Sequence, residues 1–224
     1  SAELLCEGSS NRIGEGTAMK HDFIEEPERQ VPVYADVDVC VIGGSATGVF
    51  AAVRAARLGA SVALVEAANC FGGSATLSMV NHWHRIHSVD GDTQIIGGLS
   101  VEVIDELMRR GAGVLNVNER THIEYNTEVM KLVLDDLVAG ESNIEPFLHS
   151  TFSSAVVDGS NIRGVVIETK SARVAIRARN FVDASGDGDL AAACGVLYRK
   201  AERIMPGTTC AKIEGMPPRD AWNL

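Results

Sequence analysis

The sequence predicts an α/β fold, in which a parallel sheet carries packed helices and is followed by inserted helices and an antiparallel β-meander. Three observations support this prediction. Residues 37–66 read as strand, glycine turn, helix and strand, and residues 147–184 read as three successive strands. Two segments between them have the apolar spacing of amphipathic helices. Helices packed on a sheet are a stable way to bury both kinds of apolar face.

The strongest local pattern lies in residues 37–66. β-branched residues lead into Gly43-Gly44, and an alanine-rich helix is expected from about Ala46 to Leu58, where small side chains allow close packing on a sheet. A second strand, Ser61–Val65, ends at an acid, Glu66. The result is a strand–turn–helix–strand unit with its glycine turn and its acid at the same end of the sheet.

This unit is suited to an adenine dinucleotide. A pyrophosphate needs accessible backbone N–H groups and the positive end of a helix dipole, and a glycine turn allows that approach. Glu66 follows Gly43 by 23 residues, near the roughly 20 expected for an acid that binds a ribose diol. Ser45 stands where the pattern Gly-x-Gly-x-x-Gly has its second glycine, and its N–H and hydroxyl can still meet phosphate. The alternative is a βαβ unit that binds no nucleotide. The candidate binding residues are Gly43, Gly44, Ser45, Ala46, Thr47, Gly48 and Glu66.

Composition limits the other function classes. The 224 residues are 46% hydrophobic, and the net charge of −10 without a basic stripe argues against nucleic acid as a partner. No apolar run reaches the roughly 18–20 residues of a membrane span, and residues 1–30 do not resemble a secretory signal. None of the five cysteines forms a Cys-x-x-Cys pair. We therefore expect free thiols and a cytoplasmic location.

The chain between the two strand regions carries packing helices and a histidine group. Helices are expected at about Ser100–Arg110 and Thr127–Ala139, the second capped by Asn126 or Thr127. Residues 81–87 contain His82, His84 and His87. These histidines could bind a metal, line a substrate pocket or simply pack at the surface. No acid or cysteine at a suitable spacing completes a ligand set, so no metal site is predicted.

The meander is expected as Phe147–Val157, Ile162–Lys170 and Arg173–Ala184. It runs into a second glycine turn at 185–188, which contains Asp187 and is flanked by Asp183 and Asp189. A calcium loop is the rival interpretation, but the EF-hand spacing and its terminal glutamate are missing. We interpret the turn as a second contact with the cofactor.

These motifs together resemble a family. Val-Ile-Gly-Gly-Ser-Ala-Thr-Gly, Ala-Ala-Arg-Leu-Gly-Ala-Ser-Val-Ala-Leu-Val-Glu, Phe-Gly-Gly-Ser-Ala-Thr, Gln-Ile-Ile-Gly-Gly-Leu and Val-Asp-Ala-Ser-Gly-Asp-Gly-Asp-Leu-Ala occur in this order between about Phe23 and Pro217. The chain resembles FAD-dependent oxidoreductases of the glutathione-reductase-like fold class, and among these the group related to fumarate reductase flavoproteins. The resemblance implies a Rossmann-like FAD-binding domain and FAD as cofactor.

The resemblance also implies roles for single residues. It places Gly43, Ser45, Ala46 and Gly48 against the FAD pyrophosphate and Glu66 at the adenosine ribose. It places Gly72, Gly73, Ser74 and Thr76 near the ribityl and flavin end, the backbone at Phe152 against adenine, and Ser185, Gly186 and Asp187 in a later turn that meets the cofactor. Covalent attachment of FAD through His82, His84 or His87 stays open, without a sequence pattern to support it.

The implied organisation has three parts. Residues 1–35 are expected to be a partly disordered lead-in, and residues 36–200 an FAD-binding domain with a helical segment at about 77–140 and the meander at about 147–184. Residues 201–224 are expected to begin a substrate or cap region that is truncated here, because relatives continue well beyond this length. The catalytic arginine of fumarate-reductase-type enzymes normally lies in that later part, so no catalytic residue is assigned.

Three functions follow as hypotheses. The leading one is an FAD-dependent oxidoreductase, or its FAD-binding part, that transfers hydride to or from a small organic substrate. The second is a non-catalytic FAD-binding fragment, and the third, weaker one is an NAD-dependent dehydrogenase. Besides a small-molecule substrate, the expected partners are a second copy of the chain or a complementary C-terminal half.

Overall fold

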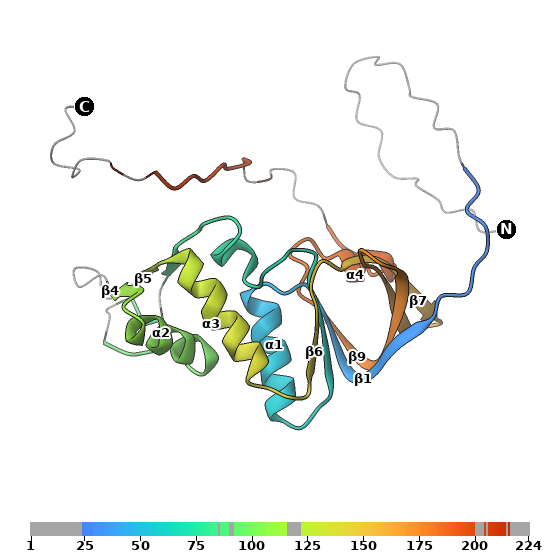
Figure 1. Ribbon diagram of the computed structural model, residues 1–224, viewed down its shortest axis with the longest axis horizontal. Helices are drawn as coiled ribbons and strands as arrows, with labels where there is room; N and C mark the ends of the chain where they lie inside the picture. The colour runs from blue at the N-terminus through green and yellow to red at the C-terminus, as the bar shows by residue number, and fades with distance from the viewer. Residues whose placement is uncertain are drawn as a thin grey trace, which may run out of the picture. The chain divides into compact units, whose positions relative to one another are not determined.

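The computed structural model describes residues 24–84, 86–89, 92–115, 122–199, 204, 206–213 and 215. The compact unit that carries the site is Val31–Leu224. Its main sheet has six strands in the order β6-β2-β1-β9-β8-β7 (Figure 1). Their bounds are β1 Val33–Ile42, β2 Val62–Val65, β6 Ile144–Phe147, β7 Thr151–Asp158, β8 Asn161–Glu168 and β9 Arg173–Asp183.

The central strand β1 pairs in parallel with β2 on one side and with β9 on the other. Parallel pairing buries both faces of a strand, and the apolar run at the end of β1 fits this requirement. Val41 faces one core cluster, and Cys40 and Ile42 face the other, all at 2% exposure or less. β7, β8 and β9 continue the sheet as an antiparallel meander. The α/β fold with a parallel sheet and a meander is therefore confirmed.

Three helices pack together beside the parallel part of the sheet (Figure 1). They are α1 (Ala46–Arg57), α2 (Leu99–Arg109) and α3 (Thr127–Ala139). Asn126 caps α3 by accepting hydrogen bonds from the N–H groups of Glu128 and Val129. Leu134 of α3 and Leu107 of α2 are completely buried in the cluster that joins these helices to β1 and β2. The two helices expected as packing elements therefore have that role.

The remaining elements are short. A second sheet has the order β3-β5-β4, with β3 at His82–His84, β4 at Gly113–Leu115 and β5 at His122–Tyr125. A single turn of 3₁₀ helix, η1, covers Gly73–Ala75, and α4 covers Asp189–Ala193. Both lie directly after glycine-rich segments.

The structure corrects two strand boundaries. β1 begins at Val33, inside the stretch expected to be a lead-in. The meander begins at Thr151, because residues 144–147 form β6, a separate strand that pairs in parallel with β2. β6 is an edge strand, where Pro146 needs no further ladder partner for its missing N–H. Residues 1–23 and most of 201–224 lie outside the described residues, so the domain limits predicted there stay predictions.

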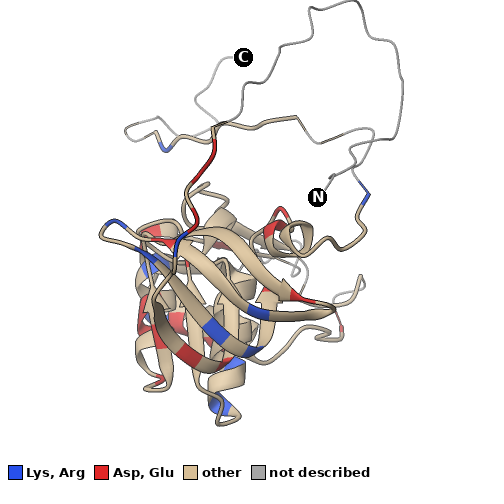
Figure 2. Ribbon diagram, turned by 90° about the vertical axis from the view of Figure 1, so that its right-hand side faces the viewer, with Lys and Arg blue, Asp and Glu red and all other residues tan. Residues whose placement is uncertain are grey.

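Charges on the strands come in both signs (Figure 2). Asp38 of β1 forms an ion pair with Arg179 of the neighbouring strand β9 at 2.9 Å, and Asp36 and Arg177 are register partners. A surface that binds a polyanion usually carries mainly positive charge, and this surface does not. Among the described residues, no helix is long and apolar enough to cross a bilayer.

Candidate functional site: two glycine turns at one end of the sheet

The first glycine turn joins β1 to α1. Gly43 has φ 97°, and its N–H donates to the carbonyl of Val65 at the end of β2. A Cβ on Gly48 would lie 1.8 Å from the carbonyl oxygen of Gly43. Glycine is therefore required at both positions, for conformation at the first and for space at the second.

Ser45 replaces a glycine without strain. Its φ is −59°, a value that any L-residue adopts, and its Oγ accepts a hydrogen bond from the N–H of Gly48 as the N-cap of α1. The same hydroxyl donates to the carbonyl of Ala184 at 3.3 Å. Because the hydroxyl of Ser45 makes these two hydrogen bonds within the protein, its backbone N–H is the group that can bind a phosphate.

The start of α1 presents backbone donors. No described residue accepts a hydrogen bond from the N–H of Ala46 or Thr47, as expected for the first turn of a helix. Thr47 is exposed and Ala46 half-buried. These donors and the positive end of the helix dipole together suit an anion such as a pyrophosphate.

Glu66 connects the second strand to the glycine turn. Its carboxylate accepts hydrogen bonds from the N–H groups of Gly44 and Ala68, both at 2.7 Å. Each oxygen has a second lone pair, so the carboxylate can also accept from a sugar hydroxyl. The acid is held at the mouth of the turn, where the sequence places a ribose ligand.

The segment at 72–76 packs against the first turn. The N–H of Gly72 donates to the carbonyl of Gly44, and a Cβ on Gly73 would lie 3.2 Å from Cβ of Ser45. Ser74 is exposed, whereas Thr76 is 1% exposed and donates its hydroxyl to the carbonyl of Phe71. The side chain of Thr76 therefore stabilises this segment from within.

The second glycine turn lies beside the first. β9 pairs with β1 up to the register pair Asp183 and Ile42, and a Cβ on Gly43 would lie 2.3 Å from the carbonyl oxygen of Ala184. The two turns, separated by about 140 residues in the chain, are in direct contact at the carboxyl ends of adjacent parallel strands. Ligands of open α/β sheets bind at this end of the strands.

Asp183 organises the second turn, a role that its position in a group of three acids did not reveal. Its Oδ1 accepts from the N–H and hydroxyl of Ser185, and its Oδ2 accepts from the N–H of Ala191. Partial burial raises the pKa of Asp183, but these hydrogen bonds together outweigh that effect and hold the pKa below its ordinary value. Gly186 has φ 90°, and Asp187 is exposed at the tip of the turn.

Comparison with known proteins agrees with this geometry. A sequence profile of the family described as FAD dependent oxidoreductase matches residues 38–223. The chain belongs to this family. FAD is therefore its cofactor, and the prediction from the sequence motifs is confirmed.

Three relatives illustrate the match. The mitochondrial dihydrolipoyl dehydrogenase of Schizosaccharomyces pombe is 29% identical over 163 residues, which cover 67% of this chain and 28% of that protein. The structure of THI4 from Thermovibrio ammonificans has TM-score 0.52 and 19% identity, covering 70% of this chain and 61% of its own. The structure of the p-nitrophenol 4-monooxygenase PnpA of Pseudomonas putida DLL-E4 has TM-score 0.51 and 11% identity. The match covers 72% of this chain and 43% of the monooxygenase. The chain thus spans less than two thirds of each of them.

The residues present fit FAD. The two turns in contact, the backbone donors of α1 and the carboxylate of Glu66 supply what a pyrophosphate and a ribose need. A cavity of about 270 Å³ lies next to them, lined by Ala46, Thr47, Phe50 and Trp83 among others. Ligand pockets are usually about 300–1,000 Å³, so this cavity can enclose only a part of a dinucleotide.

Phe152 lies at the start of the edge strand β7 and packs against the core under the meander. The segment just before it, residues 148–150, lies beside Glu66, because the N–H of Ser150 donates to the carbonyl of Glu66 and that of His149 donates to the carbonyl of Ala68. The backbone two residues before Phe152 is thus next to the acid. The adenine contact at Phe152 stays a prediction.

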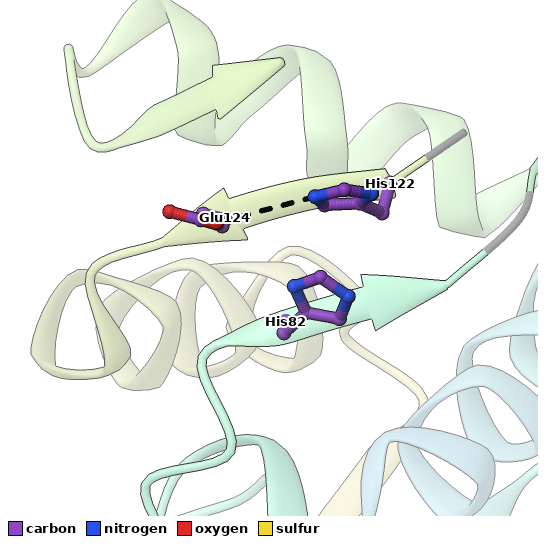
Figure 3. A group of neighbouring side chains, drawn as sticks. All are labelled: His82, His122 and Glu124. Carbon is purple, nitrogen blue, oxygen red and sulfur yellow. Dashed lines mark ion pairs between the residues drawn. The ribbon is translucent and has the colours of Figure 1, made fainter. Parts of the chain in front are cut away.

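The histidine segment forms β3 and acquires partners that the sequence did not indicate. β3 pairs antiparallel with β5, so that His82 lies opposite Glu124 and His84 opposite His122. Figure 3 shows the rings of His82 and His122 close together, with Glu124 beside them on β5. His87 lies outside this group, next to Gln94.

Proposed function

We propose that this chain is the FAD-binding part of an oxidoreductase that transfers a hydride between the flavin and a small organic substrate. Bound FAD supplies the redox chemistry, and the protein supplies binding, orientation and electrostatics. The observation that carries the proposal is the direct contact of the two glycine turns at the carboxyl ends of β1 and β9.

Each part of the site has a task in this proposal. The N–H groups of Ala46 and Thr47 bind the pyrophosphate, and Glu66 binds the ribose while its two backbone hydrogen bonds keep it in place. Asp187, at the exposed tip of the second turn, meets the cofactor from the other side. Gly72, Gly73 and Ser74 extend the binding surface towards the flavin end.

A second candidate is a non-catalytic FAD-binding unit. It is supported by the described residues at the two turns, which supply contacts for a cofactor and to which no catalytic role is assigned. A complementary C-terminal half or a second copy of the chain would then complete the active site. We propose a cytoplasmic location for either form, on the basis of the free thiols of the described cysteines.

The test uses purified protein, visible absorption and thermal unfolding with and without FAD. Glu66→Gln should lower the affinity for FAD at least about 10-fold, because one of its two oxygen acceptors becomes a donor. Glu145→Gln, an exposed glutamate on β6, is the matched control and should leave the affinity unchanged.

The outcomes separate the two candidates. Reduction of bound flavin by a member of a substrate panel supports the oxidoreductase, and tight binding without reduction by any of them favours the non-catalytic unit. Protein that stays colourless and whose melting temperature does not respond to FAD would contradict both.

A further inference from the structure

We propose that His82, His122 and Glu124 form a binding site for a divalent first-row transition metal ion, with Zn²⁺ as the best match. The three residues offer ligand atoms that all lie within 4.8 Å of one another (Figure 3). The three ligands lie outside the two glycine turns, although His84, the neighbour of His82, lines the cavity beside the first turn. The proposal does not rest on the proposed function.

Strand register brings the group together. In the antiparallel pair of β3 and β5, His82 is opposite Glu124, and His84 is opposite His122. Side chains alternate between the two faces of a strand, so these four residues share one face of the small sheet. His122 and Glu124 follow His82 by about 40 residues in the chain, and only the pairing of the strands reveals the group.

The opposite face of the small sheet holds the backbone in position. Trp83 packs edge to face on Phe50 of α1 and on Tyr125. Ile123 and Tyr125 are 3% and 5% exposed, and the hydroxyl of Tyr125 donates to the carbonyl of Val80 at 2.8 Å. Because the strands are fixed from behind, the ligand side chains start from preorganised positions, which lowers the entropic cost of binding.

The distances are those of a site that can close on an ion. Zn²⁺ with bonds of about 2.0–2.1 Å in a tetrahedron holds its ligand atoms about 3.3 Å apart. The Nε2 of His122 and Oε1 of Glu124 are 4.0 Å apart, and the ring centres of His82 and His122 are 4.2 Å apart. Because all the ligand atoms lie within 4.8 Å of one another, closure shortens each separation by at most about 1.5 Å, a change within the reach of side-chain torsions.

The ligand types select the metal. Two imidazoles and one carboxylate suit Zn²⁺ and similar ions, whereas Mg²⁺ and Ca²⁺ prefer oxygen alone and Cu⁺ prefers sulfur. His122 is 6% exposed, while Glu124 is exposed. The site thus has a buried side and a side open to solvent, which leaves one coordination position for water. His84 lies beside the group, with its Nδ1 3.4 Å from Nε2 of His82.

The experiment is a titration of the purified full chain, freed of metal with a chelator, with Co²⁺ and then with Zn²⁺. Absorption is followed at wavelengths beyond the flavin bands. The wild-type protein should bind one Co²⁺ with the visible bands of a tetrahedral site, and Zn²⁺ should displace it. His82→Asn and Glu124→Gln should each lower the affinity at least about 10-fold, a loss seen even when only supporting residues of metal sites are removed.

The control variant is His149→Asn, an exposed histidine outside the small sheet. Its φ of 51° is one that asparagine tolerates, so this variant should fold and bind metal like the wild type. Circular dichroism checks that both ligand variants, which replace partly or fully exposed side chains, keep their fold. Absence of one-to-one binding, equal affinity in the ligand variants, or an equal loss in His149→Asn would each overturn the proposal.

Discussion

Gly48→Ala tests the geometry of the first glycine turn most directly. The new Cβ would lie 1.8 Å from the carbonyl oxygen of Gly43 and 3.2 Å from Cβ of Ala184, while real Cβ atoms essentially never come within 3.0 Å of a neighbour. Gly43 cannot move away easily, because it packs closely against the backbone of Ala184 and Ser185. The backbone of the turn must therefore shift by more than 1 Å.

Two effects oppose each other in this variant. Alanine in place of glycine inside a helix stabilises the folded state by about 1 kcal/mol. Overpacking of a rigid site costs about 3 kcal/mol, since backbone rather than a flexible side chain must yield. We expect a net loss of about 2 kcal/mol in the free energy of unfolding, and at least about a 10-fold loss in FAD affinity, because the displaced N–H groups at the start of α1 no longer converge.

Urea unfolding of the apoprotein, followed by circular dichroism, measures the first quantity, and titration with FAD measures the second. Gly97→Ala is the matched control, because its φ lies outside the left-handed region and its Cβ would meet only a side-chain atom of Gln94, at 3.9 Å. It should stay within about 0.5 kcal/mol of the wild type. A Gly48→Ala protein with the stability and FAD affinity of the wild type would refute the reasoning.

Three further predictions concern stability and reactivity. Leu134→Ala, at 0% exposure, should lower the free energy of unfolding by about 2–5 kcal/mol, whereas Leu132→Ala, at 56% exposure on the same helix, should change it little; urea unfolding of both compares them. Because hydrogen bonds lower the pKa of Asp183 in the folded protein, its contribution to stability is present above about pH 4 and lost as the pH falls through the folded pKa. The stability difference between wild type and Asp183→Asn, measured by urea unfolding at a series of pH values, should therefore shrink below about pH 4, and a constant difference would contradict this assignment. Burial raises the pKa of Cys40 to about 12, so at pH 8 a thiol reagent should label exposed Cys210 rapidly and Cys40 only after unfolding, as mass spectrometry of the peptides can check.

The first glycine turn could be predicted because its determinants are local. Gly43 and Gly48 lie close together in the chain, and strand, turn, helix and acid follow within 30 residues. The prediction that the turn near Ser185 meets the turn near Gly43 went beyond local pattern. It is confirmed because parallel strands with similar glycine turns tend to end at the same edge of a sheet.

The features that were missed depend on pairing between distant segments. β6 is four residues long and contains Pro146, so in the sequence it merges with the meander that follows. His122 and Glu124 become neighbours of His82 only through the antiparallel register of β3 and β5. Asp183 could be recognised as one of several acids, but its hydrogen bonds depend on the shape of the turn that it holds.

The adjacency of β1 and β9 has a consequence for the biosynthesis of this protein. β1, at residues 33–42, leaves the ribosome well before the strand that completes its second edge, which follows only at residues 173–183. Pairing over such a separation is slow, because the entropy of closing a long loop is lost before the contacts between the strands stabilise the chain. The nascent chain can therefore trap its cofactor only once β9 has emerged, and until then one side of β1 is an unpaired edge that needs protection from other chains.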